Sequence, residues 1–289
     1  MRSLKGWPGV VLLTLLVTAV LLGVSYGGLL PWFLVRAENV LPRRVAVSTT
    51  WLGYGRPGTE HTRSFTSTVP VGTARALVLA NVTGRVSVES SRTPGQVEVT
   101  AVKRAWGTAD QARQALDAIQ VQVEAGADAV VVTTEPSRRW PSYSSVDYRV
   151  RVPEGFGVTV ETVTSEVDLR GVFDSVTVTV VTGRVDLDIE APVRKVTVKL
   201  VTGVAIARFT PVPGGSYELT VTAGTVAAEV PAAAGIDATL TVVSGSVSPG
   251  PGPWVLRASD GRRFEGTAAG GGANLTLTAV TGTVSLSRR

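Results

Sequence analysis

Five carboxylates stand close enough together in the sequence to suggest a site for a divalent cation. They alternate along two strand-like segments, at Glu166, Asp168, Asp186, Asp188 and Glu190. Calcium takes oxygen ligands of this kind, and stacked strands would bring the acids of successive repeats within about 4.8 Å of one another. Arg170, Arg184 and Arg208 follow at similar positions, so a solvated face of mixed charge competes with the calcium site. We favour the mixed face and predict no metal site.

Catalytic constellations are missing from the rest of the chain. His61 is the single histidine, there is no cysteine, and His61 lies in an irregular segment. A serine nucleophile would need that histidine as its base, and no zinc-protease, phosphate-loop or dinucleotide motif is present. We therefore predict a protein that is not an enzyme, with no catalytic residues and no cofactor.

The charge pattern bears on partners. The net charge is +5, but the arginine pairs are scattered along the chain, at Arg43–Arg44, Arg138–Arg139, Arg262–Arg263 and Arg288–Arg289. Nucleic-acid surfaces cluster their basic residues and interleave them with aromatic ones. We predict no nucleic-acid partner.

A repeated sequence pattern determines the elements that would position any site. Each copy consists of a valine-rich strand, the dipeptide Thr-Gly and a second strand with alternating apolar residues. The glycine-equivalent positions 165, 183, 203, 224, 245 and 282 are separated by 18, 20, 21, 21 and 37 residues, and an earlier copy is centred on position 84. Repeats of this length indicate stacked units that bury a continuous core. The last step spans about two units and contains a proline-rich insert.

The apolar residues change parity at each Thr-Gly. Around Gly183 they lie five and seven residues before the glycine, at Val178 and Val176, but two and four after it, at Val185 and Leu187. Because side chains alternate faces along a strand, the chain must turn a corner there, and glycine suits a strained backbone. The predicted structural corners are Gly84, Ser165, Gly183, Gly203, Gly224, Gly245 and Gly282.

This pattern predicts an all-β fold, a parallel β-helix-like β-solenoid with rungs of about 20 residues. An antiparallel sandwich is the alternative. One short helix is expected near the N-terminal part, where Thr108 is the N-cap and Gln111 completes a capping box. Outward threonine pairs, such as Thr177 with Thr179, are typical of exposed strand positions, although similar ladders occur on ice-binding solenoids. Val204 and Ile206 point outward and could mark an interface.

An apolar segment precedes the repeats. Residues 10–35 contain no charge over 26 positions, and about 20 helical residues cross a bilayer. We predict an uncleaved transmembrane helix rather than a signal peptide, with residues 1–9 as a cytoplasmic tail, 36–64 as an irregular stalk and 65–289 as the repeat domain. The predicted localisation is a single-pass cell-membrane protein with its C-terminal domain outside the cytoplasm.

The order of these parts resembles a bacterial β-strand-repeat family of "putative adhesin" domains of unknown function. The resemblance rests on the segment from Leu77 to Val88, the short alanine-rich helix, the phrase from Tyr148 to Gly155 and the Thr-Gly strands. It covers residues 65–289 and implies a β-solenoid-like domain with no known catalytic residues.

The function that these features favour is a non-enzymatic, membrane-anchored module for adhesion, scaffolding or envelope-stress signalling. Its expected partners are the membrane and an unidentified envelope protein or glycan. Two alternatives stay open, namely a solenoid polysaccharide lyase or calcium-dependent glycan-binding protein that uses the acidic residues, and a self-assembling filament protein.

Overall fold

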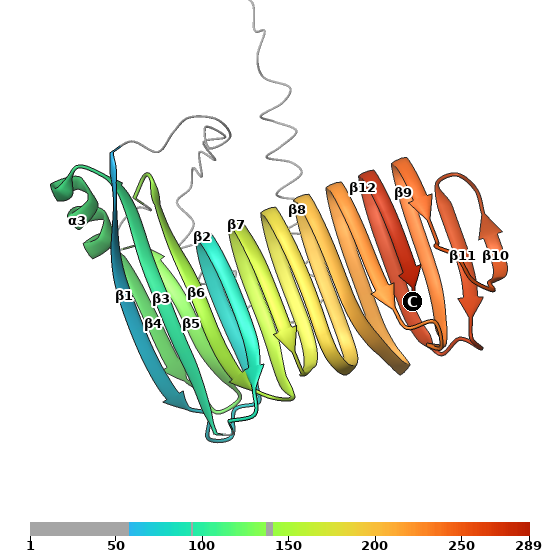
Figure 1. Ribbon diagram of the computed structural model, residues 1–289, viewed down its shortest axis with the longest axis horizontal. Helices are drawn as coiled ribbons and strands as arrows, with labels where there is room; N and C mark the ends of the chain where they lie inside the picture. The colour runs from blue at the N-terminus through green and yellow to red at the C-terminus, as the bar shows by residue number, and fades with distance from the viewer. Residues whose placement is uncertain (1–57, 94, 137–140) are drawn as a thin grey trace, which may run out of the picture. The chain divides into compact units, whose positions relative to one another are not determined.

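The computed structural model describes residues 58–93, 95–136 and 141–289. The chain divides into two units, Met1–Gly55 and Arg56–Arg289, and the description below concerns the second. The second unit is built mostly of β-strands, with α3 as the one helix among the described residues (Figure 1).

The elements follow one another with short connections. In chain order they are β1 (Thr59–Pro70), β2 (Ala76–Ser91), β3 (Gln96–Gly107), α3 (Ala109–Ala118), β4 (Ile119–Ala125), β5 (Ala129–Pro136), β6 (Ser144–Pro153), β7 (Phe156–Gly171), β8 (Phe173–Val230), β9 (Ile236–Ser248), β10 (Val255–Ser259), β11 (Arg263–Ala268) and β12 (Ala273–Arg288).

The strands form one mixed sheet of 12 strands. Its order is β1-β3-β6-β2-β7-β8-β12-β9-β11-β10, while β5 pairs with β2 and β4 off this path. The central strands β2, β7, β8, β12 and β9 pair in parallel. Both ends are antiparallel, through β1-β3-β6 and β4-β5 at one end and β9-β11-β10 at the other.

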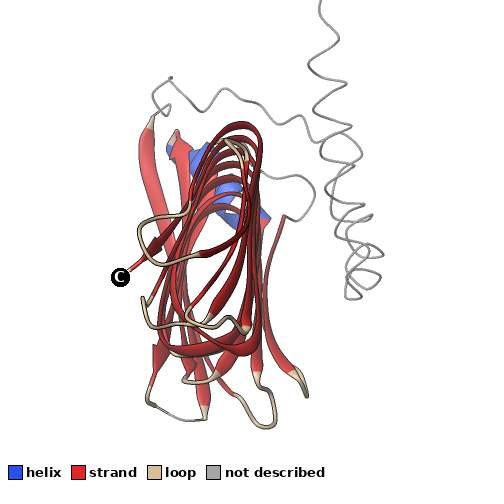
Figure 2. Cartoon of the chain, turned by 90° about the vertical axis from the view of Figure 1, so that its right-hand side faces the viewer, coloured by secondary structure: helices blue, strands red, loops and turns tan. Residues whose placement is uncertain are grey.

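The parallel strands bend sharply near their middle, as the view along the sheet shows (Figure 2). We call one strand segment before a bend, together with the segment after it, a layer. The bends lie side by side, because Gly84 pairs with Ser165, Ser165 with Gly183, and Gly282 with both Gly224 and Gly245. A Cβ atom on Gly203 would touch Gly183, and one on Gly224 would touch Gly203. These seven residues form what we call the glycine row.

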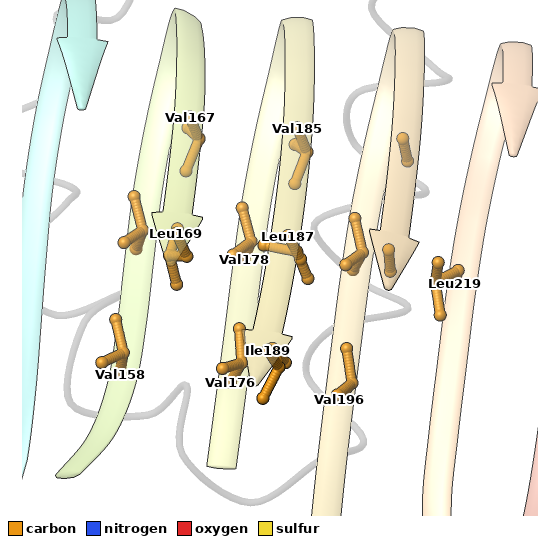
Figure 3. Close-up of a cluster of buried hydrophobic side chains, with 14 of the residues drawn as sticks. Val158, Val167, Leu169, Val176, Val178, Val185, Leu187, Ile189, Val196 and Leu219 are labelled. Carbon is orange, nitrogen blue, oxygen red and sulfur yellow. The ribbon is translucent and has the colours of Figure 1, made fainter. Parts of the chain in front are cut away.

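The core lies between the two halves of each layer. Around Gly183 the buried side chains are Val176, Val178 and Val180 before the bend, and Val185, Leu187 and Ile189 after it. Corresponding residues of neighbouring layers, such as Val158, Leu169 and Val196, stack beside them (Figure 3). The parity change at glycine therefore keeps both halves of a layer facing one apolar interior.

Helix α3 forms where its capping residues place it. The Thr108 side chain accepts a hydrogen bond from the backbone N–H of Gln111, whose side chain accepts one from the backbone N–H of Thr108. Ala112 and Leu116 are buried and form a small cluster with Ala105 of β3. The helix thus covers part of the antiparallel end of the sheet, where it contacts β1 and β3.

The predicted fold class, a β-solenoid of uniform rungs behind a transmembrane helix, is wrong. The structure is a mixed sheet with antiparallel strands at both ends, and its order departs from chain order because β12 lies between β8 and β9. The repeat spacing indicated only the strands that contain the Thr-Gly phrase. It contained no information on hairpins such as β10-β11 or on the pairing of β3 with β6.

The predicted localisation is corrected as well. The expected transmembrane helix over residues 10–35 lies outside the described residues, and within residues 58–93, 95–136 and 141–289 no helix is long and apolar enough to cross a membrane. The segment predicted as a stalk overlaps β1, which begins at Thr59.

Candidate functional site

The glycine row divides the outer surface of the parallel strands into two faces. Outward side chains at odd positions after each glycine make up one face, which we call the charged face. Outward side chains at even positions before each glycine make up the other. The two faces differ in the chemistry of their side chains.

The charged face holds the predicted acidic residues, but arginines are interleaved with them. Asp168 pairs in register with Asp186, whereas Glu166 lies opposite Arg184 and Asp188 opposite Arg170. The acids are therefore not brought together as the calcium prediction required. No group of three or more histidine, cysteine, aspartate or glutamate side chains in the described ranges is placed to hold a metal ion.

Ion pairs join successive layers across this charged face. Arg85 contacts Glu166 at 2.5 Å, and Arg208 contacts both Asp186 at 3.3 Å and Glu229 at 3.2 Å. Burial and the nearby charge of Glu166 raise the pKa of Asp168. The ion pairs neutralise part of the charge of the face, while Asp188 and Glu190 are exposed and have no ion pair among the described residues.

Most side chains of the second face are small and β-branched, and three are charged. Four and six residues before the glycine row stand Thr159, Glu161, Thr177, Thr179, Thr197, Lys199, Glu218, Thr220, Thr276, Thr278, Thr239 and Thr241. Two residues before it stands a stripe formed by Val82, Val163, Val181, Val201, Thr222, Val280 and Val243. We call the two sets together the threonine–valine face.

The observed strand order makes this face more regular than the chain order predicts. Because β12 lies between β8 and β9, Thr278 pairs in register with both Thr220 and Thr241, and Thr276 pairs with Thr239. Three threonines therefore stand side by side across three layers. Sequence reasoning singled out the threonine pairs but missed this ladder, because the position of β12 is not visible in the repeat spacing.

Apolar side chains on this face are accessible to different degrees. Val243 is 62% exposed and Val280 is 43% exposed, whereas Val163 and Val181 are half-buried. Val201 is buried, yet it is not part of the main core cluster. Together they form an outward apolar stripe beside the glycine row, a feature that is typical of binding surfaces.

Three charged residues on the threonine–valine face, Glu161, Lys199 and Glu218, have no ion pair among the described residues. Glu161 and Lys199 occupy the same offset, four residues before Ser165 and Gly203 respectively. Burial raises the pKa of the Glu161 carboxyl, and its neighbours in register are Ala80 and Thr179. The face therefore presents two carboxylates and one ammonium group that form no ion pair in the described part of the chain.

The single histidine lies elsewhere, in a shallow pocket of about 210 Å³ between β1 and α3. The pocket is lined by His61, Thr62, Arg63, Ala109, Arg113 and Leu116. No carboxylate or second histidine is among these residues, so the pocket contains no acid–base pair for His61. Val204 and Ile206, which were predicted to face outward, are half-buried in the layer of Gly203.

Comparison with known proteins gives structural neighbours only. No family model matches the chain, and no curated protein matches it. A solved structure described as a putative cell adhesion protein from Clostridium sporogenes is 10% identical, with a TM-score of 0.45, and the match covers 79% of this chain and 100% of that one. A putative adhesin from Bacteroides fragilis is 13% identical, with a TM-score of 0.32, over 81% of this chain and 100% of that one.

A third neighbour is described differently. It is a putative lipid binding protein from Parabacteroides distasonis that is 9% identical, with a TM-score of 0.28, over 81% of this chain and 98% of that one. Likeness at these levels of identity and TM-score carries no argument for what this chain binds. The neighbours are bacterial proteins, and their descriptions name no enzymatic activity.

Proposed function

We propose that this chain is a non-enzymatic binding module of the adhesion type, and that the threonine–valine face is its contact surface. The observation that supports this most directly is the contrast between the two faces. The charged face neutralises part of its own charge through pairs such as Arg208 with Asp186. The threonine–valine face is regular and partly apolar. Its residues Glu161 and Lys199 form no ion pair in the described part of the chain.

The residue types on this face favour contact with another surface. Threonine and valine have few rotamers to lose when they become buried, so ordering them on binding costs little. Threonine also provides a hydroxyl that donates or accepts a hydrogen bond. Repeated at every layer, these side chains suit a broad and nearly flat partner, such as a protein or glycan surface.

The site chemistry gives less support to the alternatives. A lyase or a calcium-dependent glycan-binding protein would need grouped acids, and Arg184 lies opposite Glu166 on the charged face. A lyase would also need a general base. His61 is the single histidine, and no carboxylate is among the residues that line its pocket. Adhesion needs neither of these features.

The proposal is tested by the binding of the full-length chain to immobilised peptidoglycan, to immobilised fibronectin and to beads coated with the chain itself. Thr177→Arg places a long charged side chain on the threonine–valine face and is expected to reduce binding to whichever surface the wild type binds. Ala227→Arg is the matched control, because Ala227 is an outward residue on the other face.

Two results would count against the proposal. Wild-type protein that binds none of the three surfaces would argue against an adhesion module. Equal loss of binding in Thr177→Arg and Ala227→Arg would argue against the threonine–valine face as the contact surface.

A further inference from the structure

The threonine–valine face has a symmetric arrangement of charge. Glu161 lies in the layer of Ser165, Thr179 in the layer of Gly183, and Lys199 in the layer of Gly203, all at the same offset before the bend. Two unpaired charges of opposite sign therefore stand one layer on either side of Thr179, and a third, Glu218, lies in the layer of Gly224 at another offset.

A two-fold axis along the strand of Thr179 would use this symmetry. Such an axis reverses the order of the layers and keeps the strand direction, so a residue faces its own offset in the partner. Glu161 then faces Lys199 of the second copy, and Lys199 faces Glu161 of the second copy. Both charges are paired by one operation, as expected for an isologous interface.

The same axis also matches the apolar stripe to itself. Val163 faces Val201 of the second copy, because they lie one layer to either side of Val181, and Val181 faces its own counterpart. Threonine lies opposite threonine across the interface, and Val163 and Val181 supply most of its apolar contact, because Val201 is buried within its own chain. No like-charged residues are brought together in these three layers.

The area of overlap fits a modest contact. An axis through the layer of Gly183 superposes five layers, from that of Gly84 to that of Gly224; at about 4.8 Å each they give a length of about 24 Å, and three columns of outward side chains span about 20 Å. The resulting area of about 480 Å² on each copy lies below the roughly 800 Å² of a standard interface and corresponds to a weak, reversible association.

From this complementarity we infer that the threonine–valine face binds a second copy of the chain, about a two-fold axis through the layer of Gly183. The inference rests on the proposed function and specifies its partner, since the adhesion would then be homophilic. The interface pairs Glu161 of each copy with Lys199 of the other, around a centre of matched valines and threonines.

The raised pKa of Glu161 fits this arrangement. Burial opposes the charge of that carboxyl in the single chain, and an ammonium group supplied by a partner would stabilise the charged form. Thr179 and Ala80, its neighbours in register, offer no charge of either sign. Self-association is therefore expected to weaken as the pH falls and Glu161 becomes protonated.

The test is sedimentation equilibrium of the full-length chain and three charge variants. Glu161→Lys and Lys199→Glu each place like charges opposite one another and are expected to weaken the dimer about tenfold or more. The double variant restores opposite charges and is expected to return the dissociation constant towards that of the wild type. Glu190→Lys is the matched control, because Glu190 is exposed and lies after the bend.

The possible results separate this inference from the proposed function. A wild-type chain that stays monomeric at its highest soluble concentration overturns the dimer, while binding to peptidoglycan or fibronectin that Thr177→Arg abolishes would leave the proposed function standing. A dimer that Glu161→Lys weakens no more than Glu190→Lys does overturns the two-fold arrangement. Failure of the double variant to recover, with each single variant still folded by circular dichroism, also overturns it.

Discussion

The carbonyl oxygen of Gly183 lies only 1.8 Å from the point that a Cβ atom on Gly203 would occupy. Gly203 also has a φ of +139°, in a region that side chains with a Cβ atom rarely adopt. The row is therefore restricted to glycine by close backbone approach as well as by conformation. Ser165 is the exception, and its hydroxyl is hydrogen-bonded to that of Thr162 inside the bend.

Gly203→Ala is accordingly expected to reduce the free energy of unfolding by roughly 2–4 kcal/mol, because the new methyl group collides with backbone that cannot move alone. Urea unfolding followed by circular dichroism measures the loss. Gly261→Ala is the matched control, since a Cβ atom at Gly261 meets nothing within 4 Å. Equal stability of the two variants would mean that the glycine row tolerates side chains.

A second prediction concerns alkaline pH. Tyr148 is buried, its hydroxyl is hydrogen-bonded to Thr134, and burial raises its pKa from 10.0 to about 12. The unfolded chain therefore ionises this phenol first, so the stability that Tyr148 contributes is complete below pH 10 and is lost as the pH rises towards 12. The loss amounts to at most about 3 kcal/mol.

Tyr148→Phe removes this ionisation, so its stability should decline less steeply than that of the wild type over the same range. Chemical unfolding of both proteins at a series of pH values gives the two slopes. The variant is expected to start from a lower stability at neutral pH, because the Thr134 hydroxyl loses its partner. Parallel declines in the two proteins would show that Tyr148 ionises equally in the folded and unfolded chains.

How much of this structure the sequence could predict is clear from the glycine row itself. The change of parity around Gly183 follows from the alternation of valines, and the buried residues on both sides of Gly183 follow it, whereas Val201, at an outward offset in the next layer, is buried. The order of the layers does not follow. Gly245 precedes Gly282 in the chain, yet Gly282 lies beside Gly224 and Gly245 is the outer neighbour.

The physical reason is that each layer offers nearly the same surface to the next. Leu277 stacks between Leu219 and Leu240, and exchanging those two leucines would leave the contacts almost unchanged. The choice is made by the hairpin of β10 and β11, in which β11 pairs with β9 over Ile236–Thr241 and β10 pairs with β11 on the outside. Only the long step from Gly245 to Gly282 indicates that something intervenes, and it does not indicate where the chain returns.

The candidate site shows the same limit. The acids at Asp186 and Asp188 were visible in the sequence, but their neighbours depend on register, which places Glu166 opposite Arg184. A shift of two residues along one strand would have grouped the carboxylates instead. Glu161 and Lys199 were visible only as interruptions of a threonine pattern, because their lack of partners is a property of the folded face.

A third prediction concerns acid. Asp237 accepts hydrogen bonds from the Thr267 hydroxyl at 2.7 Å, the backbone N–H of Gly272 at 3.0 Å and the Arg257 guanidinium at 3.0 Å. The Thr267 bond is the largest cause of its lowered pKa. The stability that Asp237 contributes is thus present above the ordinary aspartate pKa of about 3.9, and is lost as the pH falls below it.

Asp237→Asn weakens all three bonds and is expected to cost about 1–3 kcal/mol at neutral pH. The variant should also lose less stability than the wild type between neutral and acidic pH, as measured by thermal unfolding. Asp188→Asn is the control, because Asp188 is exposed and has no ion pair within the described ranges. If Asp237→Asn behaves like this control, the three hydrogen bonds do not hold the hairpin to β9.

A fourth prediction concerns the closure of the core beside β9. Trp254 packs against the core cluster, meets Phe264 edge to face at 5.1 Å between ring centroids, and lies 5.2 Å beneath the Arg288 guanidinium. This aromatic pair closes the interior where no further parallel layer is added. Removing the indole leaves apolar core atoms open to water, and substitutions of this type cost about 3–5 kcal/mol in a full core.

Because Trp254 is only partly buried, Trp254→Ala is expected to cost roughly 2–4 kcal/mol, measured by urea unfolding, and to increase the binding of a hydrophobic dye. Val255→Ala is the matched control, because Val255 follows Trp254 in the chain and is 71% exposed. This substitution should change the free energy of unfolding by no more than about 0.5 kcal/mol. If Trp254→Ala is as stable as this control, the indole does not contribute to closing the core beside β9.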